Sequence, residues 1–382
     1  MRYRNLLCLT LFVGISLAQA ATSVRLGVIV PLSGGSKSIG EDIRNGAQQA
    51  LETLRPELTL RGLRVSLYSQ DDASSAEGGT QAAQNMVKLK TVMAVVGPLN
   101  TASCQPASEV LAKANLGMVT TGCASTAFTT RNLANVNRLV ASNRALAVSG
   151  ADYLLRTVGV KTVLLIEDST PFARDLNDNL QARFVQGGGA IIERFVLPGR
   201  DLDAAVQRIL ALKPESVHLS LSSYEDSSAI IKRARRGNFS GLFLGTVLLN
   251  DPSFINLSGR DAEGITYTSY IAPLAAYSRA VNFGTIFRKR FGSTPSAFAL
   301  LGFDAALTAL EAMMRTWDSQ KELTRAAVQS ELRLSDLKNT LTGDVAFDPK
   351  GNRTSSSAFV IRIGPDLLPR VVQGFQVRAQ DN

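Results

Sequence analysis

The chain has 382 residues, of which 45% are hydrophobic, and carries 41 Lys and Arg residues against 32 Asp and Glu residues, a formal net charge of +9. A chain of this length usually forms more than one domain, and its single histidine excludes metal or triad chemistry that requires several. The basic clusters at 232–236 and 288–290 lack interleaved aromatic residues, so they indicate solvated helix faces and argue against nucleic-acid binding.

Residues 1–20 have the composition of a cleavable secretory signal. Two arginines precede an apolar run over 6–17, and Ala18, Gln19 and Ala20 then give the small-x-small pattern that signal peptidase accepts. The apolar run is shorter than the roughly 20 residues of a membrane-spanning helix. We therefore expect an exported protein in the periplasm or another extracytoplasmic space, with a mature chain that starts near Ala21.

From residue 24 onward, strand-type apolar runs alternate with amphipathic helices, which is typical of an α/β fold with mostly parallel sheets. Helical spacing is clear over 43–54 and 303–314, and short strands with turn residues follow residue 340. Pattern shifts at 141–145 and 270–274 suggest that the chain crosses between two lobes. The predicted parallel strands are 24–30, 63–69, 91–97, 116–121, 162–168, 190–197, 216–221 and 241–246.

Two of these strands, within residues 91–126, run into loops rich in Gly, Ser and Thr. Exit loops of neighbouring parallel strands lie side by side, so their hydroxyls and N–H groups can converge on one small anion. Each loop also contains a cysteine, Cys104 or Cys123. If the strands are neighbours, an oxidising compartment favours a disulfide between them; two separate buried thiols are the alternative.

Motifs for catalysis are weak. The loop at 33–38 has the wrong glycine spacing for a phosphate loop. Asp71, Asp72 and Asp304 suit helix caps and loop bracing better than acid–base chemistry. The hydroxyls of Ser33, Thr101 and Ser125 have no evident base, so they suit hydrogen bonding to a carboxylate better than nucleophilic attack. We expect no enzyme, no metal and no cofactor.

In this order and spacing, several segments resemble one family. They are GVIVPLSG, GEDIRNGAQQALE, SQDD, GPLNTASCQPASEVL, TTGCAST and GFDAALTALEA. The chain resembles the periplasmic solute-binding proteins of branched-chain amino acid ABC transporters, the Leu/Ile/Val type. The resemblance covers the mature chain and implies a two-lobed Venus-flytrap fold. It implies an N-terminal lobe of residues 21–142 and 271–344 and a C-terminal lobe of 143–270 and 345–382.

By position in that family, three residues would hold the ligand's carboxylate. They are Thr101 and Gly122, together with Ala124 or Ser125, between which the alignment is ambiguous by one residue. Charge-assisted hydrogen bonds of this kind contribute about 1.5 to 3 kcal/mol each.

The resemblance also places aromatic residues of the second lobe, Phe172 and Tyr224, over the ligand's side chain, and makes Phe298 an apolar wall. Ile39 occupies a place where amino acid binders have an aromatic residue. Val247 stands where those binders have an acid that pairs with the ligand's ammonium. This departure favours a carboxylate without an α-amino group, or a neutral amide, unless Asp226 or Asp251 substitutes for the missing acid.

The function implied is capture of a small carboxylate, such as an apolar amino acid or related organic acid, and delivery to an ABC permease. We expect a monomer that binds no nucleic acid. A ligand-sensing module of the same fold that reports to a signalling partner is the alternative. An exported hydrolase is a third possibility, and the missing base argues against it.

Overall fold

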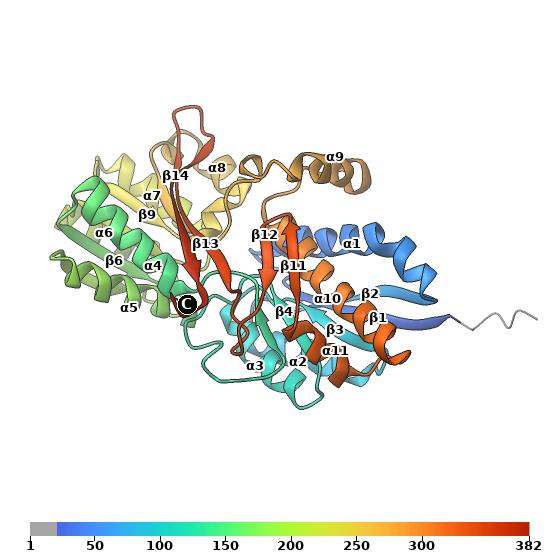
Figure 1. Cartoon of the computed structure of the whole chain (residues 1–382). Coiled ribbons are helices and arrows are strands. Elements are labelled where there is room, and N and C mark those ends of the chain that lie inside the picture. Colours follow the sequence, from blue (N-terminus) through green and yellow to red (C-terminus); the bar gives the residue numbers. More distant parts are fainter. Residues whose placement is uncertain (1–20, 382) are drawn as a thin grey trace, which may run out of the picture.

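The computed structural model describes residues 21–381 and consists of two lobes, each built around a mostly parallel sheet flanked by helices (Figure 1). This architecture confirms the predicted α/β fold class. The signal peptide predicted for residues 1–20 lies outside the described residues. Within residues 21–381, no helix combines the length and apolar character needed to cross a membrane.

The first lobe contains a five-stranded parallel sheet of order β2-β1-β3-β4-β5 and a small β11-β12 hairpin. Its elements are β1 (Thr22–Val30), α1 (Lys37–Leu60), β2 (Leu63–Asp71), α2 (Ala76–Lys88), β3 (Val92–Val96), α3 (Thr101–Ala112), β4 (Gly117–Thr120), β5 (Val136–Arg138), α9 (Ala280–Phe291), α10 (Phe298–Gln320), α11 (Arg325–Arg333), β11 (Asp336–Thr340) and β12 (Gly343–Ala346).

Helices cover both faces of this sheet, which is why its strands are near-continuous apolar runs. One core cluster joins α1 and α10 to the sheet, and a second joins α2 and α3 to it. All five residues of β3 are buried. The carboxyl ends of the strands are therefore the part of the sheet left open to a ligand.

The second lobe contains a seven-stranded sheet of order β14-β13-β10-β9-β8-β6-β7. Strands β6 to β10 run parallel, and β13 and β14 close the sheet in antiparallel pairing. Its elements are α4 (Asn143–Asp152), a π-helix (Tyr153–Val158), β6 (Thr162–Glu167), α5 (Pro171–Gln186), β7 (Ala190–Val196), α6 (Leu202–Leu212), β8 (Ser216–Ser220), α7 (Tyr224–Arg236), β9 (Leu242–Gly245), α8 (Pro252–Ser258), β10 (Thr266–Ser269), β13 (Ser355–Ile363) and β14 (Pro369–Arg378), and short 3-10 turns lie at Val247–Asn250, Gly259–Ala262, Leu274–Ala276 and Ala379–Asp381.

Three strands, β5, β10 and β11, were not predicted from the sequence. Residues 266–269 read Thr-Tyr-Thr-Ser, which lacks the apolar run of the other strands. They are nevertheless buried, because β10 lies between β9 and β13 and both of its edges are paired. Tertiary pairing here overrides local composition.

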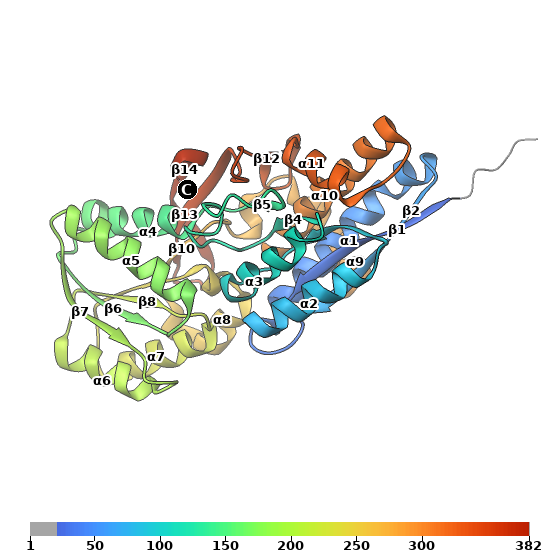
Figure 2. The same cartoon turned by 90° about the horizontal axis from the view of Figure 1, so that it is seen from below.

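The chain passes between the two sheets three times, after β5, after β10 and after β12 (Figure 2). Arg138 lies at the first crossing, and its side chain is buried. It donates hydrogen bonds to the Ser125 carbonyl at 2.8 Å and to Asn352 Oδ1 at 2.6 Å, and Asn352 belongs to the third crossing. Burial lowers the pKa of Arg138 to about 10. Three such crossings are the arrangement expected of a hinge, in which the connecting segments bend together. The exact residue limits predicted for the two lobes remain a prediction.

The single histidine, His218, is buried in β8, with Nδ1 2.7 Å from Asn177 Oδ1. Burial lowers its pKa to about 3. In the unfolded chain this histidine has a pKa of about 6.5, so below that pH the unfolded chain takes up a proton that the folded chain does not. The free energy of unfolding should therefore decrease as the pH is lowered, by about 1.4 kcal/mol at about pH 5.5.

Denaturant unfolding of the wild type and of His218→Gln at about pH 7.5 and about pH 5.5 measures this loss. Gln keeps a hydrogen-bonding side chain but does not titrate, and the other titrating groups are common to both proteins. We expect the wild type to lose about 1.4 kcal/mol more than the variant over this interval. Equal losses would contradict the assignment of a buried neutral His218.

Candidate ligand-binding site

A cavity of about 90 Å³ lies between the lobes and is lined by residues of both. All of its lining residues follow the carboxyl ends of strands, from both sheets, as expected for ligand sites of parallel sheets. The lining residues are Ser36, Ser74, Leu99, Asn100, Thr101, Ala102 and Gly122 from the first lobe, and Thr170, Pro171, Phe172, Ser222, Val247, Leu248 and Tyr270 from the second lobe and its crossing.

The start of helix α3 supplies hydrogen-bond donors to this cavity. In the described chain, the N-cap residue Asn100 makes no side-chain cap hydrogen bond, and the first N–H groups of the helix, on Thr101 and Ala102, have no carbonyl within the helix to bond. Thr101 is only 3% exposed, and its buried hydroxyl has no hydrogen-bond partner among residues 21–381. A buried unpaired hydroxyl is costly, and this one belongs to a residue that lines the cavity.

Hydrogen bonds behind α3 fix the direction of its first turn. Asp72, at the end of β2, accepts from the Ser103 hydroxyl at 3.0 Å and from the Ser74 amide at 2.9 Å. Asn100 Nδ2 donates to the Ser74 hydroxyl at 2.7 Å. Burial raises the pKa of Asp72 to about 6, against the hydrogen bonds that favour its charged form. Asp72 thus braces the donor helix, the role predicted for it.

Gly122 lets the loop after β4 approach α3. A Cβ atom at this position would lie 2.5 Å from Leu99 Cδ1 and 2.8 Å from the Tyr270 hydroxyl. A disulfide between Cys104 and Cys123, whose Cα atoms are 6.1 Å apart, ties this loop to the same helix. The two predicted loops therefore face the cavity together, with the Tyr270 hydroxyl beside them. Burial raises the pKa of Tyr270, so its hydroxyl stays protonated and can donate a hydrogen bond.

The second lobe contributes two loops that share one carboxylate. Asp168 accepts from the amide of Thr170 at 3.0 Å and from the amide of Ser222 at 2.7 Å, and from both of their hydroxyls. Thr170 also caps α5, which starts at Pro171, so Phe172 is held in the first turn. The buried side chains of Val247 and Leu248 follow β9 and complete an apolar wall.

Two side-chain hydrogen-bond sets join the lobes beside the cavity. Ser38, at the start of α1, donates to Asp251 at 2.8 Å. Asp175 of α5, in the second lobe, accepts from the amide of Thr126, in the first lobe, at 3.0 Å. The lobes are thus in contact around the cavity.

Four of the predicted ligand-binding residues line the cavity: Thr101, Gly122, Phe172 and Val247. Tyr224 lies in an adjoining hollow that shares Ser36, Ser74, Thr170 and Ser222 with the cavity. The structure does not bring the other four to the lining.

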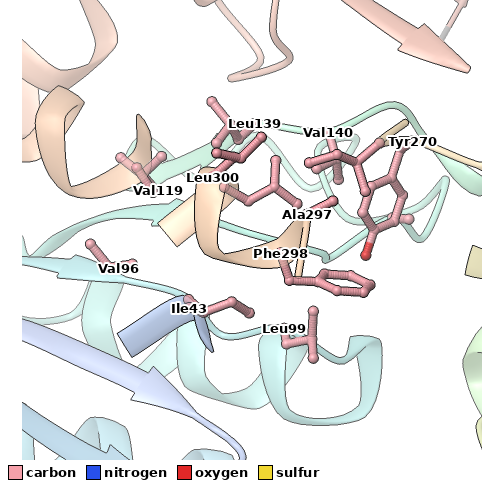
Figure 3. Close-up of a cluster of buried hydrophobic side chains, with 14 of the residues drawn as sticks. Ile43, Val96, Leu99, Val119, Leu139, Val140, Tyr270, Ala297, Phe298 and Leu300 are labelled. Carbon is pink, nitrogen blue, oxygen red and sulfur yellow. The ribbon is translucent and has the colours of Figure 1, made fainter. Parts of the chain in front are cut away.

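The reasons differ among these four. Ile39 and Phe298 are buried in the core of the first lobe. Figure 3 shows Phe298 in one cluster with Leu99 and Tyr270, two residues that do line the cavity. The carbonyls of Ala124 and Ser125 are instead turned to the hinge, where the amide of Asn143 donates to Ala124 at 2.6 Å and Arg138 donates to Ser125.

Sequence reasoning missed several lining residues. Thr170 and Ser222 adjoin the aromatic residues that were chosen, and Ser74 follows the predicted strand that ends in Asp71 and Asp72. Their position in the sequence could have identified these three lining residues, because each is a polar residue that closely follows the end of a strand. Tyr270 gave no such signal, because the strand before it was not predicted.

The family of periplasmic binding proteins matches residues 23–366. A Leu/Ile/Val-binding protein homolog of Brucella melitensis is 28% identical over 258 residues, which cover 67% of this chain and 70% of that protein. The leucine binding protein LivK of Thermotoga maritima has a similar structure, with a TM-score of 0.83 at 22% identity over 94% of this chain and all of that chain.

A solute binding protein of an ABC transporter from R. palustris, solved with benzoate, has a TM-score of 0.82 at 16% identity over 94% of this chain and 99% of that chain. These likenesses confirm the predicted two-lobed type of fold and the resemblance found in the sequence. The chain belongs to the periplasmic binding protein family, with relatives that are Leu/Ile/Val-binding proteins.

Proposed function

We propose that this protein is the extracytoplasmic substrate-binding component of an ABC transporter, and that it captures a small carboxylate in the cavity between its lobes. It has no catalytic role, needs no cofactor and binds no nucleic acid. It works as a monomer and delivers its ligand to a membrane permease. The relative named for Leu, Ile and Val and the structural neighbour solved with benzoate support this ligand class.

The observation that carries the proposal is the buried, unpaired hydroxyl of Thr101 at the first turn of α3. A carboxylate at this place accepts from that hydroxyl and from the free N–H groups of the helix, and the helix dipole favours its negative charge. Apolar side chains of the second lobe, Phe172 and Leu248, contact the rest of the ligand. A ligand that contacts both lobes stabilises the closed form.

Native mass spectrometry of the freshly purified protein, followed by thermal unfolding with amino acids, 2-oxo acids and aromatic acids, tests the proposal. A ligand present at 100 times its dissociation constant raises the free energy of unfolding by about 2.7 kcal/mol. We expect at least one small carboxylate to produce such a shift. If none does, the proposed ligand class is wrong.

A further inference from the structure

The lining of the cavity contains no charged side chain. It consists of hydroxyl groups, one amide, backbone and apolar side chains. Among the donors, the Thr101 hydroxyl has no partner within residues 21–381, and it lies at the start of α3. The cavity can therefore stabilise one negative charge through neutral donors and the helix start, but none of its lining side chains can pair with a positive charge.

The acids nearest to the cavity already have partners. Asp168 accepts from the amides and hydroxyls of Thr170 and Ser222. Asp251 accepts from the Ser38 hydroxyl and the Ser253 amide, each at 2.8 Å.

In the adjoining hollow, Asp226 pairs with Arg200, and Glu225 accepts from the Ser223 hydroxyl at 2.8 Å. None of these four acids lines the cavity itself. They brace loops through the contacts that they already make.

The absence of an anionic side chain from the cavity lining disfavours binding of an α-amino acid. Its ammonium is bonded to the same carbon that carries the carboxylate, so a carboxylate at Thr101 brings the ammonium into the same cavity. A buried ammonium without an anionic partner is strongly disfavoured. The same acid without the amino group makes all of the favourable contacts and leaves no charge unpaired.

We infer that this site takes a small monocarboxylate with a branched or aromatic apolar body and no α-amino group. Its carboxylate lies at the start of α3, and its body packs against Leu99, Phe172, Val247 and Leu248. This inference deepens the proposed function and rests on it.

Matched ligands test the inference on the unmodified protein. The pairs are 4-methylpentanoate with leucine, and 3-phenylpropanoate with phenylalanine, each measured by isothermal titration calorimetry. We expect the better of the two acids to bind at least about 100-fold more tightly than its amino acid. The amide of that acid, which keeps the body but loses the charge, should bind at least about tenfold more weakly than the acid.

The outcomes separate the two proposals. Leucine or phenylalanine binding as tightly as its matched acid overturns the inference and leaves the proposed function intact. An amide that binds as tightly as the acid overturns the placement of a carboxylate at α3. If no carboxylate of any kind binds, both proposals fall.

Val247 offers a matched pair of variants. Val247→Asp places a negative charge at the lining, and Val247→Asn places a neutral side chain of nearly equal size there. We expect Val247→Asp to bind leucine at least about tenfold more tightly than Val247→Asn, with circular dichroism to verify that both fold. Equal leucine affinity of the two folded variants contradicts the inference; if either fails to fold, the matched ligands decide alone.

Discussion

Replacing Thr101 with valine should weaken ligand binding by about 10- to 150-fold, the ratio that corresponds to about 1.5 to 3 kcal/mol for a hydrogen bond to a charged group. Valine has nearly the same shape, so the cavity keeps its form. Because the Thr101 hydroxyl is buried and unpaired within the described chain, its removal should not lower the melting temperature of the ligand-free protein. Calorimetric titration with the best ligand and thermal unfolding of the empty protein measure the two effects.

The matched control is Thr120→Val. The hydroxyl of Thr120 is also buried without a partner in residues 21–381, but Thr120 belongs to β4 and does not line the cavity. We expect this variant to bind the ligand as the wild type does. If Thr101→Val also binds normally, or if both variants weaken binding equally, the Thr101 hydroxyl does not contact the ligand.

The combination of unimpaired stability and impaired binding distinguishes a binding residue from a structural one. Most buried polar groups are paired because an unpaired one is costly. The Thr101 hydroxyl has no partner within residues 21–381, and under the proposed function a carboxylate would supply the acceptor. Thr101→Val would then lower the affinity without lowering the stability of the empty protein.

The sequence predicted the fold well where composition and position agree. Strands such as β3 and β8 are short apolar runs between helices, and the structure has them where the pattern indicates. Strand β10 was not predicted, because residues Thr266 to Ser269 form a strand only through pairing with the two neighbouring strands, β9 and β13. Its position in the sheet depends on β13, about 90 residues later in the chain, which no local pattern reports.

For the candidate site, strand-end logic identified the loops of Thr101 and Gly122, and the resemblance added Phe172 and Val247. The resemblance also offered Ala124 and Ser125, but the chain turns toward Arg138 within two residues of Gly122. Which residues of a loop face a cavity depends on such a turn, and residue types alone do not set it. Tyr270 reaches the cavity from a crossing segment, so only the tertiary structure relates it to Gly122.

The geometry of the hinge depends on another buried carboxylate, and its removal should have the largest effect on stability. Asp304, in α10, is buried and accepts from the Thr340 hydroxyl at 2.7 Å, the Leu341 amide at 3.0 Å, and the amide and hydroxyl of Thr342 at 2.7 and 2.6 Å. Burial raises its pKa, against the four donors and the nearby charge of Arg353. This is the bracing role that the sequence suggested for Asp304.

Arg353 connects this brace to the third crossing between the lobes. Its guanidinium is buried and donates to the Thr342 hydroxyl at 3.1 Å and to the Leu139 carbonyl, beside the first crossing, at 3.3 Å. Asp304 therefore holds the turn between β11 and β12, and β12 leads into the third crossing. Asp304 also supplies negative charge near the buried Arg353 cation.

Asp304→Ala should lower the free energy of unfolding by about 3 to 5 kcal/mol, because it leaves several donors unpaired and a buried cation without its nearby anion. Asp318→Ala is the control on the same helix. Asp318 is about half exposed and pairs with Arg61 at the surface, so its loss should cost less than about 1 kcal/mol. Denaturant unfolding measures both variants, and a loss for Asp304→Ala no larger than that for Asp318→Ala would mean that the turn and the hinge are held without this carboxylate.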